Sequence, residues 1–235
     1  MKQPWHRQLA GGLPGWLRGR VLRFEAITAG RLKLFAQSLP PGAWVLDAGA
    51  GEARDAQHFA HCHYVAVDLG VGDAQWDYSQ LDARADLARL PFADGRFAAA
   101  LNIVVLEHIR RPARVLAEIA RVLQPGAPFL LLVPQEWGVH EASHDYFRYT
   151  RHGLEWLLEQ AGFEHFTIEP VGGFFTLLGR RMLDSVLFFQ GGWRWLLFPF
   201  AVVLAAPIGL ALPSLDFLDR GRETTLGYIC LAKKR

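Results

Sequence analysis

VLDAGAGEARDA, residues 45–56, contains the features that decide the fold. A short apolar run ends in Asp47, and Gly49 and Gly51 follow before a segment, residues 52–60, that we expect to be helical. In an α/β protein such a strand, turn and helix present backbone N–H groups at the carboxyl end of a parallel strand. Glycine has no Cβ, so a ligand is able to approach the backbone closely there. The stretch therefore predicts a ligand-binding turn in a parallel sheet.

The residues that follow alternate between apolar strand patterns and helical patterns, which predicts a parallel sheet with right-handed crossovers. Pro112 is expected to open the most regular helix, and Pro125–Gly126 to end it. Thr150 is the expected N-cap of a later helix. The predicted strands are residues 44–46, 63–67, 81–86, 97–103, 129–133, 166–169 and 227–232.

Composition and charge indicate a folded protein with a basic N-terminal segment. The 235 residues are 51% hydrophobic, which is enough for a sizeable core, and the two cysteines lack a disulfide-like spacing. We therefore expect a cytoplasmic protein without a cleaved signal. Residues 1–35 hold seven Lys/Arg against one acidic residue, whereas the remainder holds 18 against 22. This basic, amphipathic N-terminal arm, residues 1–40, is expected either to touch an anionic membrane or to pack on the domain, and nucleic acid is not expected as a partner.

Residues 171–225 form an apolar insertion before the last predicted strand. Its two apolar pieces are residues 174–189 and 195–215, and the second carries no charge. That piece is long enough to span a bilayer, but its three prolines are expected to interrupt it, and a single crossing would separate the last strand from its sheet. The alternatives are a helical hairpin that dips into one leaflet, a lid over an apolar acceptor, and the interface of a homodimer.

Two acidic residues at strand ends indicate the chemistry of the ligand. Asp68 ends the second strand, 17 residues after Gly51, where its carboxylate is able to accept hydrogen bonds from ribose hydroxyls. Asp47 directly precedes the turn, where it disfavours a pyrophosphate and favours a ligand with an ammonium and a sulfonium group. An NAD(P)-dependent oxidoreductase on a similar sheet is the alternative, and Asp47 and Arg54 argue against it.

Five segments in the order DAGAGEAR, VAVDL, ADLARLPFADGRF, NIVVLEHI and LQPGAPFLLLVPQ resemble the class I S-adenosylmethionine-dependent methyltransferases, in particular the type 11 group. The resemblance covers roughly residues 40–170 and the last strand. It implies an α/β, Rossmann-like fold with a mostly parallel seven-stranded sheet, helices on both faces and an apolar helical insertion before the last strand. It also implies a methyltransferase domain over residues 41–235 and S-adenosylmethionine as the cofactor.

The same resemblance implies a set of cofactor-binding residues. Gly49 and Gly51 would let the backbone pass the methionine part of the cofactor, and Asp68 would bind the ribose hydroxyls. Two positions depart from the family pattern, because Ala53 and Ala98 stand where a glycine and an aspartate are common. The full implied set is Asp47, Gly49, Gly51, Asp68, Leu69, Asp86, Leu87 and Asn102.

Residues after the fourth and fifth strands are the candidates for contact with the methyl acceptor. His108 lies in LEHI, and His140 and Tyr146 lie in HEASHDYFRYT. We expect these three as catalytic residues, since an acceptor that loses a proton needs a nearby base. The alternative is a structural segment in which aromatic residues pack a lid and Arg148 pairs with Asp145. HEASHDYFRYT looks like a stretch of type 11 proteins in glycan and lipid biosynthesis, so the expected acceptor is a lipid, lipid-linked or glycan precursor.

Metal binding is not expected. His61 and His63 flank Cys62, but no second ligand pair is spaced to complete a zinc site. A further alternative to the enzyme is a non-catalytic, membrane-peripheral protein that retains the cofactor site. The expected location is the cytoplasm, with association at the inner face of the membrane.

Overall fold

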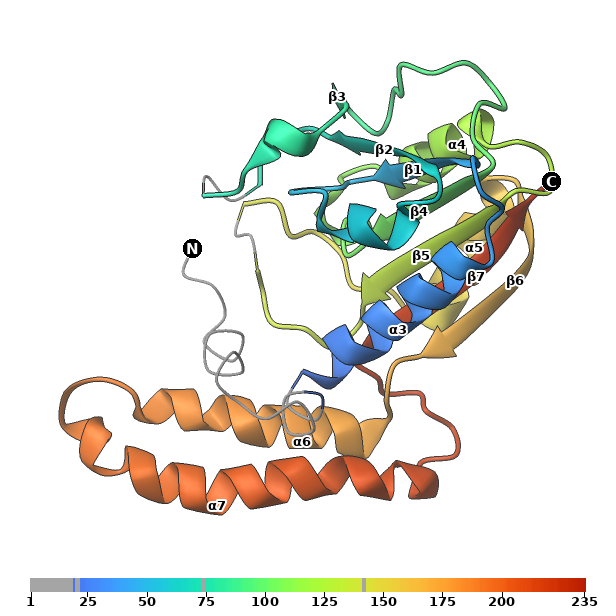
Figure 1. Cartoon of the computed structure of the whole chain (residues 1–235). Helices are drawn as coiled ribbons and strands as arrows, with labels where there is room; N and C mark the ends of the chain where they lie inside the picture. Colours follow the sequence, from blue (N-terminus) through green and yellow to red (C-terminus); the bar gives the residue numbers. More distant parts are fainter. Residues whose placement is uncertain (1–18, 20–21, 73–74, 141–142) are drawn as a thin grey trace. The chain divides into compact units, whose positions relative to one another are not determined.

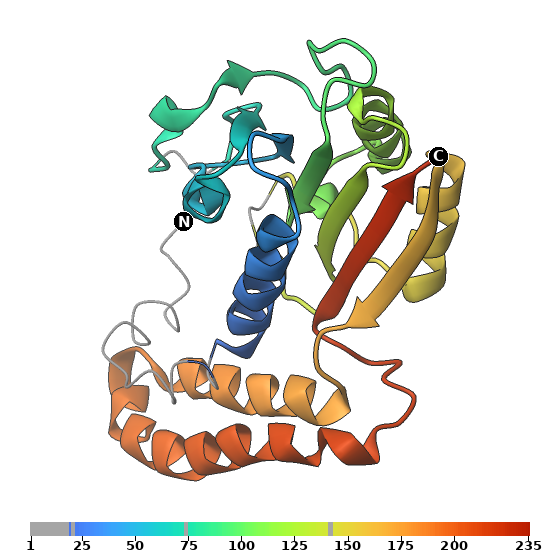
Figure 2. The same ribbon diagram turned by 45° about the vertical axis from the view of Figure 1, so that its right-hand side comes forward.

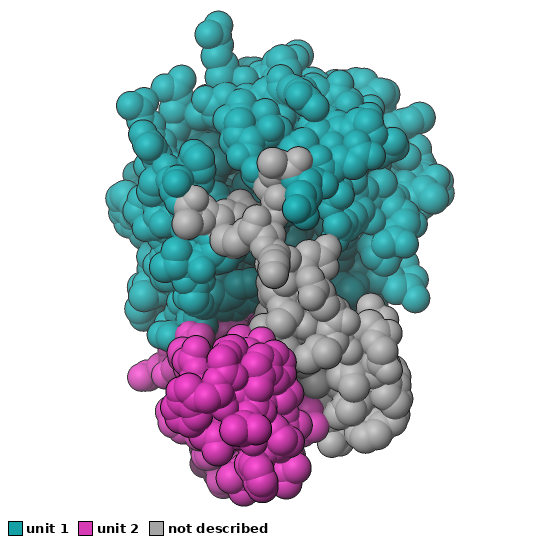
Figure 3. All heavy atoms as spheres, turned by 90° about the vertical axis from the view of Figure 1, so that its left-hand side faces the viewer, with its two compact units in different colours: residues 1, 28–169, 228–235 teal, residues 2–27, 170–227 magenta. Residues whose placement is uncertain are grey.

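The computed structural model describes residues 19, 22–72, 75–140 and 143–235, and the chain divides into two compact units (Figure 3). Unit 1 comprises Thr28–Glu169 and Tyr228–Arg235, and unit 2 combines Pro170–Gly227 with the described residues before Thr28. Most of the basic arm predicted before residue 23 lies outside the described residues. From Arg23 onward the chain forms helix α3, Arg23–Gln37.

Unit 1 is built around a seven-stranded sheet with the strand order β3-β2-β1-β4-β5-β7-β6. The four pairs from β3 to β5 in this order are parallel, and Figure 2 shows β7 running opposite to β5 and β6. The predicted mostly parallel, seven-stranded sheet is therefore confirmed. The strands are β1 (Trp44–Ala48), β2 (His63–Asp68), β3 (Ala83–Arg84), β4 (Ala99–Ile103), β5 (Pro128–Pro134), β6 (Phe163–Pro170) and β7 (Gly227–Lys234).

Helices cover both faces of the sheet. Figure 1 shows α3 on one face and α4 (Pro112–Val122) and α5 (Arg151–Gln160) on the other. Pro112 opens α4 as predicted, because its missing N–H falls in the first turn, where no helical partner exists. The Thr150 hydroxyl caps α5 by accepting a hydrogen bond of 3.2 Å from the Gly153 amide. Both sequence signals are therefore confirmed.

The order of the central strands determines where a ligand is able to bind. β1 lies between β2 and β4, and Leu46 pairs with Val65 on one side and Ala100 on the other. The chain builds β2 and β3 on one side of β1 before it returns to build β4 and β5 on the other side. Ligands of α/β sheets bind at such a switch point, outside the carboxyl ends of the strands.

Two predicted elements are shorter than expected. Residues 52–60 contain a 3₁₀ helix, η1 (Arg54–Phe59), because Ala53 adopts a left-handed conformation with φ 54° and interrupts an α-helical start. The strand predicted at 81–86 is reduced to two residues at the sheet edge. The Asp82 carboxylate there accepts the Ala66 amide at 2.8 Å, and this bond takes the place of a backbone partner.

Unit 2 contains the apolar helical insertion predicted before the last strand. Two antiparallel helices, α6 (Phe174–Ser185) and α7 (Phe198–Ala211), form a hairpin (Figure 1). Two of the three prolines do not interrupt the second helix as expected, whereas α7 ends at Ala211, just before Pro213. Pro199 lies in the first turn of α7, and Pro207 inside α7 removes only one helical hydrogen bond. Three 3₁₀ segments complete the insertion: η4 (Val186–Phe189), η5 (Gly192–Leu196) and η6 (Leu212–Leu218).

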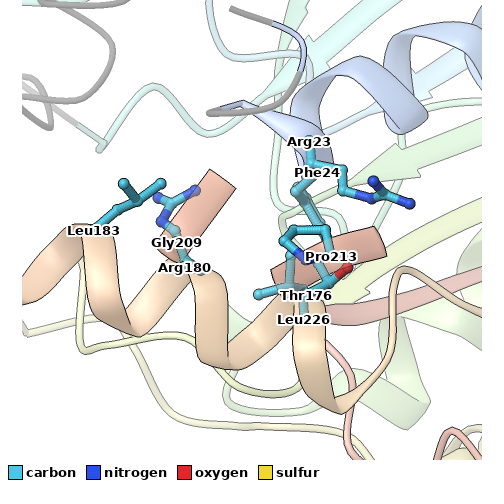
Figure 4. A pocket seen from close by; sticks show the side chains of 8 residues that line it. All are labelled: Arg23, Phe24, Thr176, Arg180, Leu183, Gly209, Pro213 and Leu226. Carbon is cyan, nitrogen blue, oxygen red and sulfur yellow. The ribbon is translucent and has the colours of Figure 1, made fainter. Parts of the chain in front are cut away.

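A cavity of about 10 Å³ lies within unit 2. This volume is close to the minimum that holds one water molecule, so the cavity accommodates no cofactor or acceptor. Figure 4 shows the side chains around it, which come from Arg23, Phe24, Thr176, Arg180, Leu183, Gly209, Pro213 and Leu226. The strand ends of unit 1 are therefore the candidate location of the functional site.

Candidate functional site

The turn after β1 has the conformation that its glycines predict. Gly49 and Gly51 have φ values of 98° and 54°, in the left-handed region. A Cβ atom on Gly49 would lie 2.5 Å from Cγ2 of Val105, a distance that side chains do not tolerate. Val105 belongs to the segment that follows β4, so the glycine turn lies directly against that segment.

Asp68 fixes the glycine turn from the end of β2. Its carboxylate accepts the Gly51 amide at 3.0 Å and the Gly70 amide at 2.7 Å. Each carboxylate oxygen has further acceptor capacity, which suits it to the hydroxyls of a ribose. Leu69, the predicted adenine contact, is exposed next to it. Asp68 thus lies beside the glycine turn, and its contact with a ribose stays a prediction.

Asp47 is buried at the end of β1 and accepts a hydrogen bond from the Tyr64 hydroxyl. Burial raises the pKa of Asp47 to about 8, against the lowering effect of the Tyr64 bond, and the charges of Asp55 and Asp68 raise it further. In the ligand-free protein Asp47 is therefore mostly protonated at neutral pH. A cationic ligand at this turn would be attracted by the nearby carboxylates, which agrees with the ammonium and sulfonium groups expected from the sequence.

Asp47→Asn is expected to remove a pH dependence of folding stability. The pKa of Asp47 is about 8 in the folded protein and ordinarily 3.8, so the folded state binds more protons between these values. Its contribution to stability is complete below the lower value and falls by about 1.4 kcal/mol per pH unit until pH passes the folded pKa. Asparagine stays neutral and still accepts from Tyr64.

Urea unfolding of the wild type and Asp47→Asn across the interval between these pKa values measures this effect. The free energy of unfolding of the variant minus that of the wild type should increase with pH. A difference that stays constant across the interval would show that Asp47 is ionised in the folded protein.

Asn102, Asp86 and Leu87 complete the predicted cofactor set. Asn102 in β4 is fully buried, and its Nδ2 donates to the Ala48 carbonyl at 2.6 Å, whereas Oδ1 has no hydrogen-bond partner in the described structure. An orphaned buried acceptor beside the glycine turn fits a ligand that brings a donor such as an ammonium group. Asp86 is exposed and accepts the Ala88 amide at 2.9 Å, and Leu87 is buried.

A buried carboxylate lies beyond the end of β4, in the 3₁₀ segment η3 (Leu106–His108). Glu107 is fully buried, and neither carboxylate oxygen has a hydrogen-bond partner in the described structure. Nε2 of His140 and Nε2 of His108 lie 3.7 Å and 3.8 Å from its Oε1. The structure thus brings two predicted catalytic residues, His108 and His140, to one buried carboxylate.

Both imidazoles are oriented by backbone carbonyls. Nδ1 of His140 lies 3.2 Å from the Gly138 carbonyl, and Nδ1 of His108 lies 3.0 Å from the His144 carbonyl. A carbonyl accepts only, so each Nδ1 carries a proton and each Nε2 faces Glu107. Burial lowers the pKa of His140, but its interactions with Glu107, the Gly138 carbonyl and Asp145 outweigh burial and raise it above the ordinary value.

The loop after β5 is held in place by Asp145 and Arg148. Arg148 donates to Asp145 at 2.5 Å and 2.7 Å and to the Gly138 carbonyl at 3.0 Å, and its hydrogen bonds lower the pKa of Asp145 to about 2. The Asp145 carboxylate also accepts the His140 amide at 2.9 Å. The pairing of Arg148 with an acid, which the structural alternative predicts, is confirmed with Asp145 as the partner, and Asp145 also holds the His140 amide.

Tyr146, the third predicted catalytic residue, is connected to the same loop. Its hydroxyl donates to the Ser143 carbonyl at 3.1 Å and accepts from Nε of Arg110 at 2.9 Å. Its backbone amide donates to the Glu107 carbonyl at 2.9 Å. The hydroxyl is therefore occupied within the loop, while the backbone ties the loop to η3.

Sequence reasoning missed Glu107, although it stands beside His108 in LEHI. The available signal was an acidic residue at the end of the apolar run from Ile103 to Leu106, which continues beyond β4. Ligand atoms of Glu107, His108 and His140 lie within 4.8 Å of one another, so this group has the composition of a divalent-metal site as well as that of a proton acceptor. This group shares no residue with His61, Cys62 and His63, whose spacing does not complete a zinc site.

Comparison with known proteins identifies the fold family. Residues 46–131, from β1 to β5, match the model of the type 11 methyltransferase domain. Residues 46–131 are therefore similar to the methyltransferase domain of the type 11 group. The cofactor of this group is S-adenosylmethionine. The nicotinamide-dependent alternative is thereby disfavoured.

Named relatives support the same family. A probable S-adenosylmethionine-dependent methyltransferase of Mycolicibacterium smegmatis is 31% identical over 61% of this chain and 60% of its own length. A tRNA (carboxymethyluridine(34)-5-O)-methyltransferase of Arabidopsis thaliana is 30% identical over 54% of this chain and 32% of its own. The chain thus spans less than two thirds of both relatives. A methyltransferase structure from Archaeoglobus fulgidus has a TM-score of 0.56 at 14% identity, covering 88% of this chain and 93% of its own, which shows a shared fold.

Proposed function

We propose that the protein transfers the methyl group of S-adenosylmethionine to an oxygen or nitrogen atom of an acceptor that loses a proton in the reaction. One observation carries this proposal. The glycine turn after β1 lies against Val105, and Glu107 with its two histidines follows two residues later. The predicted cofactor turn and a proton-accepting group therefore border one another at the sheet switch point.

The residues that would hold the cofactor are those of the glycine turn and its carboxylates. Asp68 would accept from the ribose hydroxyls, and the buried Asn102 Oδ1 would accept from the ammonium group. Asp47 is protonated without the ligand, and a bound cation would favour its ionised form. When bound, S-adenosylmethionine supplies an electrophilic methyl group on a sulfonium sulfur. Positioning of the acceptor against that methyl group accounts for much of the catalysis in such a displacement.

His140 is the proposed proton acceptor. In its neutral form Nε2 carries a lone pair, because Nδ1 donates to the Gly138 carbonyl. A proton taken from the acceptor would reside on Nε2, which is buried and has no hydrogen-bond partner in the described structure, so the acceptor has to enter the space beside Glu107 to reach it. Glu107 at 3.7 Å would then stabilise the imidazolium. Glu107 is thus a positioning residue that acts through His140, and His108 shares the same carboxylate.

Glu107→Gln is expected to shift the pH dependence of turnover. Activity requires neutral His140, so kcat/KM should fall as pH decreases through the pKa of His140, which lies above its ordinary value. Removal of the Glu107 charge lowers that pKa, and the acidic limb of the profile should move to lower pH. Glu155→Gln, which alters an exposed pair with His152 on α5, is the matched control. An unchanged acidic limb in Glu107→Gln would contradict the proposed role of the carboxylate.

The proposed acceptor is a lipid or a lipid-linked glycan precursor at the inner face of the membrane. The resemblance of HEASHDYFRYT to proteins of glycan and lipid biosynthesis and the exposed apolar helix of unit 2 support this class. Calorimetric titration with S-adenosylmethionine and, in parallel, NAD⁺ tests the cofactor part. Binding of S-adenosylmethionine alone is the expected result, and preference for NAD⁺ would overturn the proposal. Formation of S-adenosylhomocysteine in the presence of an acceptor distinguishes an enzyme from a non-catalytic protein that only binds the cofactor.

A further inference from the structure

Helix α7 and the segment η6 form a long apolar surface within unit 2. The helical stretch Phe198–Leu218 spans 21 residues with a mean hydropathy of 1.9, and only 11% of its most apolar 18-residue window is buried. By length and composition it is the one helix among the described residues that would cross a membrane. No charged residue occurs between Arg194 and Asp216.

The packing of α7 is the reverse of that in a water-soluble helix. The residues that it buries are small, Ala205 and Gly209, and a Cβ on Gly179 of α6 would lie 2.5 Å from the Gly209 carbonyl oxygen. Four large side chains of the helix, those of Phe200, Val203, Leu204 and Ile208, are exposed, whereas Phe198, Val202 and Leu210 are half-buried. Small residues at the helix contact, with large apolar side chains outside, are typical of helices that pack in lipid, whereas a soluble helix buries its large apolar face.

The outward side chains form one continuous stripe. Phe200, Val203 and Leu204 are 67%, 71% and 67% exposed, and their spacing of three and four residues places them on one face. The stripe continues beyond the helix at both ends. Its other exposed members are Trp195, Leu196, Leu197, Ile208, Leu215, Phe217 and Leu218.

Polar groups at the open end of the hairpin are satisfied within unit 2. The buried Asp216 carboxylate accepts from the amides of Gly173 and Thr176, at 3.0 Å and 2.9 Å, and from the Thr176 hydroxyl. Asp219 accepts the Phe174 amide at 2.7 Å. The N-terminus of α6 is therefore capped by carboxylates, so its first amides do not depend on water.

The connectivity of the hairpin and the residues at the ends of the stripe indicate that the stripe contacts a membrane surface. The hairpin leaves β6 and returns to β7, its neighbour in the sheet, so it does not cross a bilayer once. The stripe carries no charged residue between Arg194 and Asp216. Trp193, Arg194 and Trp195 at its start are exposed, a combination that favours the headgroup level.

We propose that unit 2 inserts α7 into one leaflet of an anionic bilayer, as a monotopic element whose axis lies along the surface. The stripe faces the acyl chains, and Arg194, Arg220 and Arg222, which are exposed, interact with anionic headgroups. This association requires no turnover, so it stands independently of the proposed reaction.

Flotation with vesicles tests the inference on the full chain. The protein should float with phosphatidylcholine vesicles that contain phosphatidylglycerol, and less with phosphatidylcholine alone. The double variant Val203→Glu, Leu204→Glu places two charges in the stripe and should weaken vesicle binding by at least about tenfold. Trp156→Glu is the matched control, because it changes an exposed apolar residue on α5 in unit 1 and should leave vesicle binding unchanged.

Calorimetry with S-adenosylmethionine checks that each variant retains the folded cofactor site, so failure of the membrane inference and failure of the proposed function are separable. Fluorescence quenching by brominated lipids, compared between wild type and Trp193→Phe, Trp195→Phe, should place these indoles in the bilayer. A protein that stays with the aqueous phase, or that forms a dimer which the double variant dissociates, would overturn the inference. Equal binding by the double variant and the wild type would overturn it as well.

Discussion

Asp68→Asn should weaken the binding of S-adenosylmethionine by about two to four orders of magnitude. The carboxylate would accept two hydrogen bonds from the ribose, and a hydrogen bond to a charged group contributes about 1.5 to 3 kcal/mol. Asp68 also accepts the amides of Gly51 and Gly70, so its charge holds the turn in the binding conformation. Both effects act in the same direction.

Calorimetric titration of S-adenosylmethionine into the variant measures this loss. Asp94→Asn provides the control, because this substitution makes the same chemical change elsewhere in unit 1. Asp94 is an exposed carboxylate that is paired with Arg121. A melting temperature within the range of that control shows that the variant is folded. Equal affinity in Asp68→Asn and the wild type would remove Asp68 from the cofactor site.

His140→Gln should lower kcat by about 10²- to 10⁴-fold, the usual contribution of a positioned general base. Glutamine retains a polar side chain but takes no proton at neutral pH. Cofactor affinity should change little, because His140 lies after β5 and the glycine turn follows β1. A loss in kcat without a loss in binding is therefore the expected pattern.

The control for this variant is His152→Gln, which removes an exposed imidazole paired with Glu155 on α5. Initial rates with saturating cofactor, measured before and after dialysis against a chelator, separate two roles of the cluster. The proton-transfer account predicts that chelation leaves the rate unchanged. A parental rate in His140→Gln contradicts it, and a rate restored by added metal assigns the cluster to a metal instead.

Local sequence signals were enough to predict most of the helices and strands. Pro112 and Thr150 act through their own backbone and side-chain chemistry, so their effect on α4 and α5 was predictable from position. Ala53 shows the limit of such signals. Its left-handed backbone follows from the close approach of the chain around the glycine turn, and no pattern of apolar residues reports that.

The site was predictable where it depends on strand ends and was missed where it depends on packing. The positions of Asp68 and Asp47 follow from the end of a strand in the sequence. The burial of Glu107 depends on the loop after β5, whose Tyr146 and Phe147 amides donate to the Glu107 carbonyl. Such long-range contacts are absent from local sequence patterns. The exposed face of α7 was likewise not predictable from the sequence, because it depends on the close packing of Gly179 in α6 against Gly209 in α7.

Transfer of a labelled methyl group from S-adenosylmethionine to a membrane lipid extract tests the central claim most directly. The protein is incubated with the labelled cofactor and the extract, and the products are separated by mass spectrometry. The account predicts a labelled product one methyl group heavier than a lipid or lipid-linked precursor, with equal formation of S-adenosylhomocysteine, and no product with His140→Gln above its expected residual rate. Cofactor binding without any labelled product, across lipid, glycan and small-molecule extracts, would contradict the claim that this protein is a methyltransferase.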